Sequence, residues 1–405
     1  MKDSKIYGAY RELCLCAVFV SVLEKPIFQR FFEYARLADG EERKLAYSKF
    51  VSEIYEADTT LSELVGKCVF EDENAYIRKR AKGISVSRML EGEVEKELLI
   101  FERFSSLVAA DFAEDLGVDP DSLPPYDSGK LDFISEYEKR IRNIDRHGYG
   151  IFSSHGMFRL SDTLEVEPII SRDKVKMESF VGYENERDKI VENTLAFING
   201  LPAANALLTG DAGTGKSSTV KAVANMYFGD GLRLIELRKD QLHALPLVMA
   251  RINGNPLKFI IFIDDLSFNK NDDNFSMLKA ALEGSASALA DNAIIYATSN
   301  RRHIIKESFA DRDSSDDIHR NDTVQETLSL SERFGLTVLF SKPDKKLYLQ
   351  IVKTLADRYG VVLDGGEIEI GAEAFALRKG SRSARCAEQY VKSLVSKGMT
   401  LRGEN

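Results

Sequence analysis

The fold is decided by the stretch Gly210-Asp211-Ala212-Gly213-Thr214-Gly215-Lys216-Ser217-Ser218, which matches the pattern G-x-x-x-x-G-K-S/T at every defined position. An apolar run, Ala206–Leu208, leads into the stretch, and a helix is expected to begin near Ser217. Glycines allow the backbone to form a concave nest whose N–H groups point at phosphate oxygens, and the helix adds the positive end of its dipole. The stretch therefore predicts a phosphate-binding loop for a nucleoside triphosphate.

Two side chains of this loop carry the chemistry that binding needs. Lys216 is expected to reach the β- and γ-phosphates, and the hydroxyl of Ser217 is expected to coordinate Mg²⁺. Mg²⁺ is a hard cation that accepts one oxygen from the loop and another from a nearby carboxylate. The alternative is an ordinary glycine-rich turn, which the strand before the stretch and the helix after it disfavour.

Length and charge restrict the class of protein. A chain of 405 residues is longer than one ordinary domain and indicates about two or three, each with its own core. The formal net charge of −9 argues against nucleic-acid binding through the overall field of the protein. One tight basic cluster, Arg78-Lys79-Arg80 with Lys82, could contact a phosphate backbone, although an exposed helix face is the simpler interpretation.

The cysteines and the apolar runs predict a cytoplasmic protein with no membrane segment. The four cysteines, Cys14, Cys16, Cys68 and Cys386, show no C-x-x-C spacing, so neither a zinc site nor a disulfide framework is indicated. A reducing cytoplasm is the simplest compartment for such a chain. The run Leu13–Leu23 is too short to span a bilayer, and we expect it to form a buried helix.

The pattern of apolar residues divides the chain into three regions. Residues 1–170 are mostly helical in pattern and are expected to form a separate N-terminal domain. Residues 171–342 alternate short apolar strands with helices, which predicts a parallel sheet with helices on both faces. The strands are expected at Asn205–Thr209, Leu232–Leu237, Leu257–Ile263, Ala293–Thr298 and Leu336–Phe340. Residues 343–405 are expected to form a small bundle, with helices at about Asp344–Tyr359, Ala372–Arg378 and Ser383–Ser396.

A second strong signal is a buried strand, Phe259–Ile263, that ends in the two carboxylates of Asp264 and Asp265. A strand parallel to the one that feeds the loop brings Asp264 to the carboxyl edge of the sheet, where doubly wound folds bind ligands. Asp264 is therefore the expected carboxylate of the Mg²⁺ shell, and Asp265 is expected to polarise the attacking water. The alternative, an acidic helix cap, is disfavoured beside a phosphate-binding loop.

The order of these signals resembles that of the AAA+ ATPases over residues 176–400. The phosphate-binding loop and the Asp-Asp strand are followed by a strand that ends in Thr298-Ser299-Asn300, by Ser331–Gly335 and by the C-terminal helices. More narrowly, the chain resembles a bacterial family of predicted AAA+ ATPases whose biological role is uncharacterised. The segments that carry this narrower resemblance are Phe180–Tyr183, Gly210–Ser218, Phe262–Phe268, Tyr296–His303, Leu328–Gly335 and Gly380–Arg385. The resemblance implies an α/β P-loop core with a parallel five-stranded sheet, a helical lid, and Mg²⁺ with ATP as the ligands.

The resemblance also implies roles for residues outside the loop. Phe180–Tyr183, including Val181 and Gly182, would lie against adenine. Asn300 would be the sensor-1 residue near the γ-phosphate, and its alternative role is to cap a turn. Most AAA+ motors carry Glu at the second acidic position of the strand, whereas this chain has Asp265, one methylene shorter. Slow hydrolysis is therefore one expectation.

Three arginines complete the site that the resemblance implies. Arg333 would be the arginine finger, and its alternative role is a surface salt bridge. Either Arg382 or Arg385 would be the sensor-2 arginine of the lid. Because an arginine finger acts on the neighbouring subunit, the working form would be a homo-oligomeric ring or open ring with ATP sites between subunits.

No pore-loop motif indicates what such a motor would move. Protein-threading motors of this superfamily usually carry an aromatic-hydrophobic-glycine loop after the second strand, and here that place reads Arg238-Lys239-Asp240-Gln241-Leu242-His243. The acidic segment Ser308–Glu326 is a solvated loop, a gate at the interface between subunits or a contact for a partner. The partner is expected to be an unknown protein or assembly that the N-terminal domain recognises.

Two functions are consistent with these signals. The first is remodelling or assembly of a macromolecular partner through cycles of ATP hydrolysis. The second is a nucleotide-dependent loader or scaffold, in which ATP binding sets the assembly state and hydrolysis is slow. A nucleotide kinase is disfavoured, because the sensor, finger and lid motifs have no task in a monomeric kinase.

Overall fold

The computed structural model describes residues 4–38, 40–170, 175–266, 278–279, 282, 290–300 and 332–398. The chain divides into two compact units. Unit 1 comprises Met1–Ser154 with Gly254–Leu257, and unit 2 comprises His155–Asn253 with Lys258–Asn405. The apolar pattern placed the end of the N-terminal domain at residue 170, whereas residues 155–170 belong to unit 2. The motif segments 267–268, 301–303 and 328–331 and the acidic segment 308–326 lie outside the described residues.

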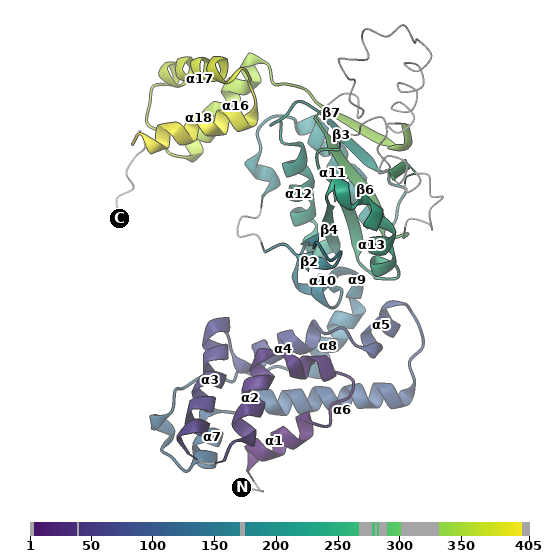
Figure 1. Ribbon diagram of the computed structural model, residues 1–405, viewed down its shortest axis with the longest axis vertical. Coiled ribbons are helices and arrows are strands. Elements are labelled where there is room, and N and C mark those ends of the chain that lie inside the picture. The colour runs from purple at the N-terminus through teal and green to yellow at the C-terminus, as the bar shows by residue number, and fades with distance from the viewer. Residues whose placement is uncertain are drawn as a thin grey trace. The chain divides into compact units, whose positions relative to one another are not determined.

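Unit 1 is built from helices (Figure 1, purple to blue). They are α1 (Lys5–Leu13), α2 (Pro26–Arg36), α3 (Glu41–Ala57), α4 (Leu61–Phe70), α5 (Ala75–Ala81), α6 (Arg88–Ser105), α7 (Ala109–Leu116), α8 (Phe133–Arg142), α9 (Ile144–His147) and α10 (Ile151–Ser154), with 3₁₀ turns η1 (Val20–Glu24) and η2 (Pro120–Ser122). Side chains cap several of them: Ser4 caps α1, Thr60 caps α4 and Ser87 caps α6. A cap of this kind stabilises its helix by about 1 kcal/mol.

Aromatic side chains form the core of unit 1. Phe31, Phe50, Phe104 and Phe112 are fully buried, and the ring centres of Phe31 and Phe104 lie 4.7 Å apart. Tilted and edge-on ring pairs of this kind contribute about 0.5–1.5 kcal/mol beyond the apolar area that they bury. The unit therefore has a core of its own.

The apolar run Leu13–Leu23 is not one helix, contrary to the prediction. Helix α1 ends at the first residue of the run, and η1 begins only at Val20. Between them, the fully buried carboxylate of Glu97 accepts the backbone N–H groups of residues 17–19 at 2.7–3.1 Å. A charged acceptor replaces the hydrogen bonds that a helix would have made. The carboxylate comes from about 80 residues away in sequence, so no local pattern could reveal it.

A seven-stranded sheet forms the centre of unit 2 (Figure 1). Its strands are β1 (Met157–Leu160), β2 (Val166–Pro168), β3 (Ala206–Gly210), β4 (Leu232–Leu237), β5 (Lys258–Ile263), β6 (Ala293–Ser299) and β7 (Leu336–Phe340), in the spatial order β2-β1-β4-β5-β6-β3-β7. All neighbouring strands are parallel except β1 and β2. The five predicted strands, β3 to β7, are confirmed and form one continuous parallel sheet.

The hairpin of β1 and β2 adds two strands that the sequence pattern did not reveal. Strand β1 pairs in parallel with β4 and antiparallel with β2, so the sheet is wider than the expected five strands. The two strands have four and three residues, too few to show an alternating pattern. Pro168 at the end of β2 suits an edge strand, because proline cannot donate to a neighbour.

Apolar side chains cover both faces of the sheet. The helices of the core are α11 (Glu184–Ile198), α12 (Lys216–Met226) and α13 (Leu245–Ile252), with 3₁₀ turns η3 (Met177–Ser179), η4 (Phe228–Asp230) and η5 (Lys239–Ala244). Leu208 and Ile260 pack in one cluster with apolar residues of α11 and α12. The alternate residues Leu207 and Ile261 point to the opposite face and are equally buried. Strands buried on both sides read as continuous apolar runs, which is why the sequence revealed them.

Three helices form the C-terminal lid, as expected: α16 (Lys345–Arg358), α17 (Gly365–Lys379) and α18 (Ala384–Ser396). Their core includes Tyr348 and Ala387, which are fully buried. Helix α17 begins earlier than predicted, because the side chain of Asp364 caps it. Across the described residues, no helix has both the length and the apolar character needed to cross a membrane.

Candidate functional site

The loop after β3 is shaped by glycines. Strand β3 ends at Gly210, beside Phe340 at the end of β7. Gly210 has a φ of +130°, and a Cβ there would lie 2.0 Å from the carbonyl oxygen of Phe340, so only glycine fits. The chain continues through Gly213 and Gly215, both with positive φ, and enters α12 at Lys216. The N-terminus of this helix therefore lies at the carboxyl edge of the sheet.

Lys216 is buried and points back into the loop. Its ammonium donates to the carbonyl oxygens of Gly210 at 2.9 Å and Asp211 at 2.7 Å, and to Oδ1 of Asn300 at 3.0 Å. A lysine has three protons to donate, so these three protein oxygens can use all of them. Burial lowers the pKa of Lys216, and the carboxylates of Asp211 and Asp264 oppose that shift. A phosphate oxygen in the loop would therefore replace one of the present partners.

Asp264 lies directly after β5, opposite the start of α12. Its Oδ1 accepts the hydroxyl of Ser217 at 2.6 Å and that of Thr298 at 2.5 Å. The hydroxyl of Ser217 and the carboxylate of Asp264 lie side by side, and both are hard oxygen ligands of the kind that Mg²⁺ prefers. Within the described ranges, no three His, Cys, Asp or Glu side chains gather in a way that could hold a metal. An Mg²⁺ ion here would need further oxygens from a nucleotide and from water.

Asp265 has an unusual backbone and a fixed side chain. Its φ is +52°, the left-handed region that residues other than glycine adopt infrequently. The side-chain amide of Asn300 donates to Oδ1 of Asp265 at 2.7 Å. Because Asn300 also accepts from Lys216, one chain of hydrogen bonds joins the lysine of the loop to the second acidic residue.

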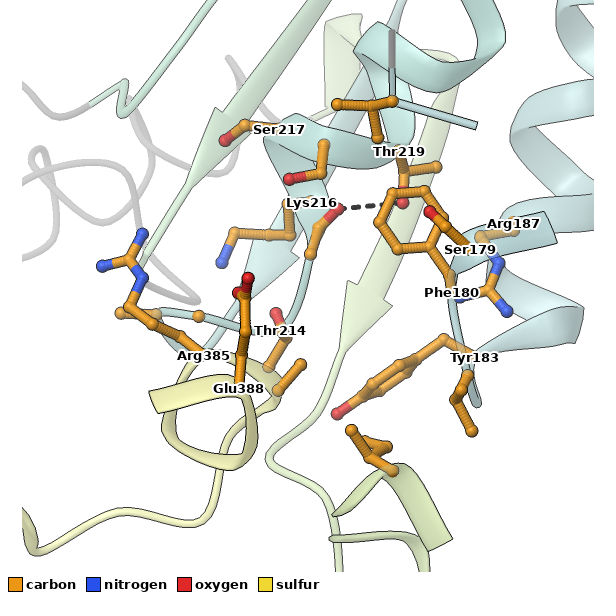
Figure 2. Close-up of a pocket in the computed structure, with 18 of the residues that line it drawn as sticks. Ser179, Phe180, Tyr183, Arg187, Thr214, Lys216, Ser217, Thr219, Arg385 and Glu388 are labelled. Carbon is orange, nitrogen blue, oxygen red and sulfur yellow. Dashed lines mark hydrogen bonds between the residues drawn. The ribbon is translucent and has the colours of Figure 1, made fainter. Parts of the chain in front are cut away.

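These side chains line a cavity of about 690 Å³ (Figure 2). Its volume lies in the range of roughly 300–1,000 Å³ that is typical of small-molecule sites. Residues 212–218 form one wall, the polar ends of β5 and β6 form a second, and residues of α16 and α18 form a third. The cavity therefore lies between the core of unit 2 and its lid.

Apolar and aromatic side chains line another part of the cavity. Phe180, Val181 and Tyr183 contribute from the segment before α11. Gly182 lies among them without lining the cavity; a Cβ at Gly182 would lie 2.4 Å from the side chain of Leu347 on α16. Glycine at this position lets the lid helix approach the segment closely. The resulting surface suits the flat face of a nucleotide base.

Only one of the two lid arginines lines the cavity. Arg385 reaches from α18 towards the loop (Figure 2), and its backbone N–H donates to the carbonyl oxygen of Gly213 at 3.3 Å. Arg382 instead forms a bidentate ion pair with Glu373 of α17, at 2.7 and 3.1 Å. The Arg382 guanidinium holds the pKa of Glu373 below its usual value. Arg385 is therefore the lid arginine placed to contact a phosphate.

Arg333 lies near the amino end of the strands, whereas the loop lies at their carboxyl end. It precedes β7, which runs from Leu336 to Phe340 and ends beside Gly210. At about 3.3 Å per residue, a strand of this length spans roughly 17 Å. The side chain of Arg333 does not line the cavity of its own chain.

The structure brings most of the predicted site residues to one cavity. The predicted residues that line it are Val181, Ala212, Gly213, Thr214, Gly215, Lys216, Ser217, Ser218, Asp264, Asp265, Asn300 and Arg385. Those that do not are Gly182, Gly210, Asp211, Arg333 and Arg382. Thr298, Arg358 and Glu388 also line the cavity and were not predicted. Of these three, only Thr298 had a signal in the sequence, because it lies in the strand that leads directly to Asn300.

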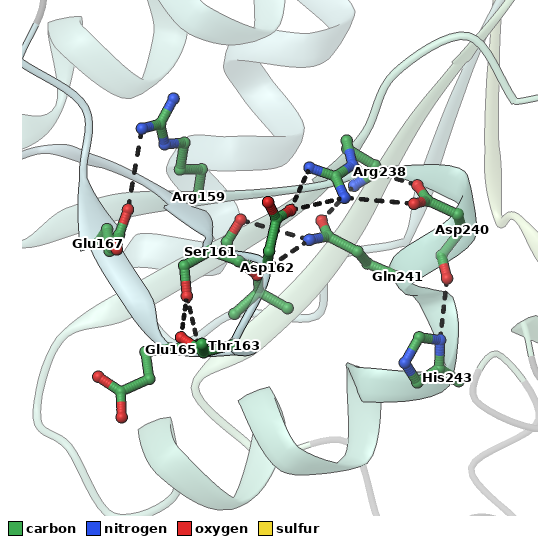
Figure 3. Close-up of polar contacts among 11 residues, drawn as sticks. Arg159, Ser161, Asp162, Thr163, Glu165, Glu167, Arg238, Asp240, Gln241 and His243 are labelled. Carbon is green, nitrogen blue, oxygen red and sulfur yellow. Dashed lines mark hydrogen bonds and ion pairs between the residues drawn. The ribbon is translucent and has the colours of Figure 1, made fainter.

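Another group of polar contacts follows β4, at the place where threading motors carry a pore loop (Figure 3). The guanidinium of Arg238 lies 3.2–3.4 Å from the carboxylates of Asp162 and Asp240. The buried amide of Gln241 donates to two backbone carbonyls at the end of β1, both at 3.3 Å. The segment is therefore fastened to the β1–β2 hairpin and presents charged side chains instead of aromatic ones.

The basic cluster of the N-terminal region lies on α5 in unit 1. Residues 78–80 and Lys82 are exposed. Two of the arginines lie near carboxylates, Arg78 at 3.6 Å from Glu73 and Arg80 at 3.9 Å from Glu91. These acidic neighbours reduce the positive field of the cluster, so the structure adds no support for a nucleic-acid contact there.

Comparisons with known proteins give one family and several distant structures. A family model described as "Protein of unknown function (DUF815)" matches residues 154–398. No curated protein matches the chain significantly. Two point mutants of Thermotoga maritima RuvB share 18% identity with it at a TM-score of 0.39, over 57% of this chain and 70% and 69% of theirs. A T. maritima RuvB structure titled as a Holliday junction branch migration motor shares 14% identity over 56% of this chain and 72% of that one, at a TM-score of 0.34. Similarity at this level carries no conclusion about activity.

Proposed function

The chain belongs to the family described as protein of unknown function (DUF815), and we propose that it is a Mg²⁺-dependent AAA+ ATPase. It would bind ATP in the cavity between core and lid and couple hydrolysis to the remodelling or assembly of a macromolecular partner. The observation that carries the proposal is the meeting of Lys216, Ser217 and Asp264 at the glycine-shaped loop of a cavity with the volume of a nucleotide site.

Each part of the nucleotide has a matching part of the cavity. The N–H groups of residues 213–217 and the ammonium of Lys216 would hold the phosphates. Phe180 and Val181 would lie against the base. Mg²⁺, held by Ser217 and Asp264, would neutralise charge on the β- and γ-phosphates.

Hydrolysis would depend on Asp265 and its partner. The carboxylate of Asp265 would orient the attacking water, and the amide of Asn300, 2.7 Å away, fixes that carboxylate at the edge of the cavity. Asn300 also touches Lys216, so arrival of the γ-phosphate at the lysine would loosen its hold on Asn300. Binding would in this way be communicated to the residue that acts on water.

The arginines would couple the presence of the γ-phosphate to the lid and to a neighbouring subunit. Arg385 would contact it from the lid of the same chain. Arg333 does not line the cavity of its own chain and would act on that of a neighbouring subunit. The proposal therefore includes a homo-oligomeric ring or open ring as the active form, with each site completed by two subunits.

Substitutions in the cavity test the proposal. Lys216→Ala removes a charged phosphate contact and is expected to weaken ATP binding at least about 10-fold. Asp265→Asn keeps the shape of the side chain, so ATP binding is expected to stay within about threefold while turnover falls about 100-fold or more. Calorimetry measures binding and phosphate release measures turnover.

The matched control is Lys221→Ala, on the same helix. Lys221 pairs with Glu236 at 2.9 Å and does not line the cavity, so this variant is expected to bind ATP like the wild type. A wild-type protein that binds no ATP at millimolar concentration would contradict the proposal. Equal loss of binding in both lysine variants would show that the effect is not specific to the cavity.

A loader or scaffold with little hydrolysis is the second candidate. It is favoured by Asp265, which is shorter than the glutamate usual in AAA+ motors and is bonded to Asn300. In that case ATP would change the assembly state of the protein without appreciable turnover. Sedimentation profiles that differ between ATP and ADP, with negligible phosphate release, would favour this function, and identical profiles would exclude it.

A further inference from the structure

Thr298 on β6 is hydrogen-bonded to both acidic residues of the site. Its side chain is buried in the sheet, and only 2% of the residue is exposed. The hydroxyl donates to Oδ1 of Asp264 at 2.5 Å and accepts the backbone N–H of Asp265 at 3.0 Å. A hydroxyl has one proton and two lone pairs, so it can make both bonds at once.

The first bond sets the direction of the Asp264 carboxylate. Oδ1 of Asp264 accepts three hydrogen bonds, from Thr298 at 2.5 Å, from Ser217 at 2.6 Å and from the N–H of Asp265 at 3.1 Å. In the part of the chain that the structure describes, no group donates to Oδ2. The carboxylate is therefore fixed by one oxygen, and the other is left for water or a cation.

The second bond holds the backbone of Asp265 in its uncommon conformation. A φ of +52° is unfavourable for a residue with a side chain, and it persists only when neighbouring groups determine it. Thr298 supplies two such constraints: its hydroxyl accepts from the N–H of Asp265, and its carbonyl oxygen accepts from the N–H of Leu266 at 2.7 Å. In this conformation the Asp265 carboxylate meets the amide of Asn300.

We propose that Thr298 is a positioning residue for the metal-holding Asp264 and the water-orienting Asp265. Its hydroxyl holds one oxygen of Asp264, which leaves the other available to Mg²⁺ or its water ligands, and it fixes the backbone from which Asp265 projects. This inference rests on the proposed ATPase function and adds a residue that lies outside the two strong sequence motifs. It predicts that one buried hydroxyl controls both metal affinity and turnover.

Three variants test this role. Thr298→Val removes the hydroxyl and keeps the branched shape, and Thr298→Ser keeps the hydroxyl. Thr194→Val is the matched control, because Thr194 is also fully buried and hydroxyl-bonded to the same strand, through Tyr296, but touches neither acidic residue. For each protein, calorimetry measures ADP binding without metal and then Mg²⁺ binding to the protein–ADP complex, and phosphate release measures turnover.

Thr298→Val is expected to bind Mg²⁺ about 10–100-fold more weakly and to lose turnover by a similar factor, as substitutions behind a metal ligand do. Binding of ADP without metal is expected to stay within about twofold, because Thr298 touches no group that holds phosphate. Thr298→Ser and Thr194→Val are both expected to behave like the wild type within about threefold. Should Thr298→Val fail to fold, Thr298→Cys, which keeps the size but is a weak donor, is measured in its place.

The outcomes separate this inference from the proposal on which it rests. Wild-type protein that binds ADP and Mg²⁺, with a Thr298→Val variant that keeps both Mg²⁺ affinity and turnover, would overturn the role of Thr298 alone. Loss of metal-free ADP binding in Thr298→Val, or equal losses in Thr194→Val, would show a general structural effect and also overturn it. Wild-type protein that binds no nucleotide would overturn the ATPase proposal and this inference together.

Discussion

At Gly210, the absence of a side chain allows the end of β3 to lie directly beside the backbone of Phe340 at the end of β7. An alanine there would place Cβ 2.0 Å from a backbone oxygen of Phe340, and backbone atoms cannot yield as a side chain can. Gly210→Ala is therefore expected to lower the free energy of unfolding of the nucleotide-free protein by about 2–4 kcal/mol. Urea titration followed by circular dichroism measures the loss.

Gly215→Ala is the control for backbone strain alone. Gly215 also has a positive φ, of +95°, but no heavy atom lies within 4 Å of an added Cβ. Its substitution is expected to cost only about 1–2 kcal/mol. Equal losses in the two variants would show that the contact with Phe340 has no effect of its own.

At the scale of single residues, sequence and structure inform about different parts of the site. Lys216 and Ser217 could be located because the loop that holds them is continuous in sequence. The network of Thr298 could not, because a hydrogen bond between the ends of two strands depends on their register. Arg382 and Arg385 also could not be told apart in the sequence, because the pairing of Arg382 with Glu373 is visible only in the structure.

At the scale of structural elements, the two arginines of the lid differ in what they contact. Arg382 ties α18 to α17 through Glu373, whereas Arg385 lines the cavity. Arg382→Met is expected to lower the midpoint of thermal unfolding at pH 7 and to leave ATP affinity within about twofold. Arg385→Met is expected to reduce turnover about 10-fold or more without changing that midpoint.

The effect of Arg382→Met on stability depends on pH with a defined sign. The folded-state pKa of Glu373 lies below its ordinary value of 4.5, so the ion pair stabilises the fold above that pH. The contribution is lost as the pH falls through the lowered pKa. The difference in unfolding midpoint between wild type and Arg382→Met is therefore expected to shrink below about pH 4. A difference that stays constant from pH 7 to pH 3 would contradict this assignment.

The elements that could be predicted are those with long, uniform patterns. Strands β3, β5 and β6 are buried on both faces, so each reads as an apolar run bounded by polar residues or glycine, whereas β7 alternates between buried and exposed residues. The β1–β2 hairpin was missed because its strands are short and partly exposed. The apolar pattern of Leu13–Leu23 predicts a helix, and this prediction is wrong because the turn within the run depends on Glu97, a carboxylate distant in sequence.

For the whole molecule, the proposed function predicts that an active site is shared between subunits, because Arg333 does not line the cavity of its own chain. Lys216→Ala and Arg333→Ala are each expected to be inactive alone. In a 1:1 mixture, an Arg333→Ala subunit keeps its loop and receives Arg333 from a Lys216→Ala neighbour. Random mixing is expected to restore up to about one quarter of the wild-type turnover.

The control mixture combines Lys216→Ala with the double variant Lys216→Ala, Arg333→Ala. No subunit in it has an intact loop, so no turnover is expected. An Arg333→Ala protein that hydrolyses ATP at the wild-type rate by itself would contradict the shared site. Failure of the 1:1 mixture to recover, with subunit exchange verified by fluorescence transfer, would do the same.

The left-handed backbone of Asp265 also bears on how this protein can evolve. Aspartate and asparagine adopt that conformation far more readily than residues with longer side chains. A single nucleotide change converts an aspartate codon into a glutamate codon, but the longer carboxylate would arrive together with a less favourable backbone. If the proposed function is correct, a single substitution of Asp265 by glutamate is therefore not expected to give faster ATP turnover. A lineage would first have to relax the turn between β5 and Leu266, and only then would glutamate be an improvement that selection could retain.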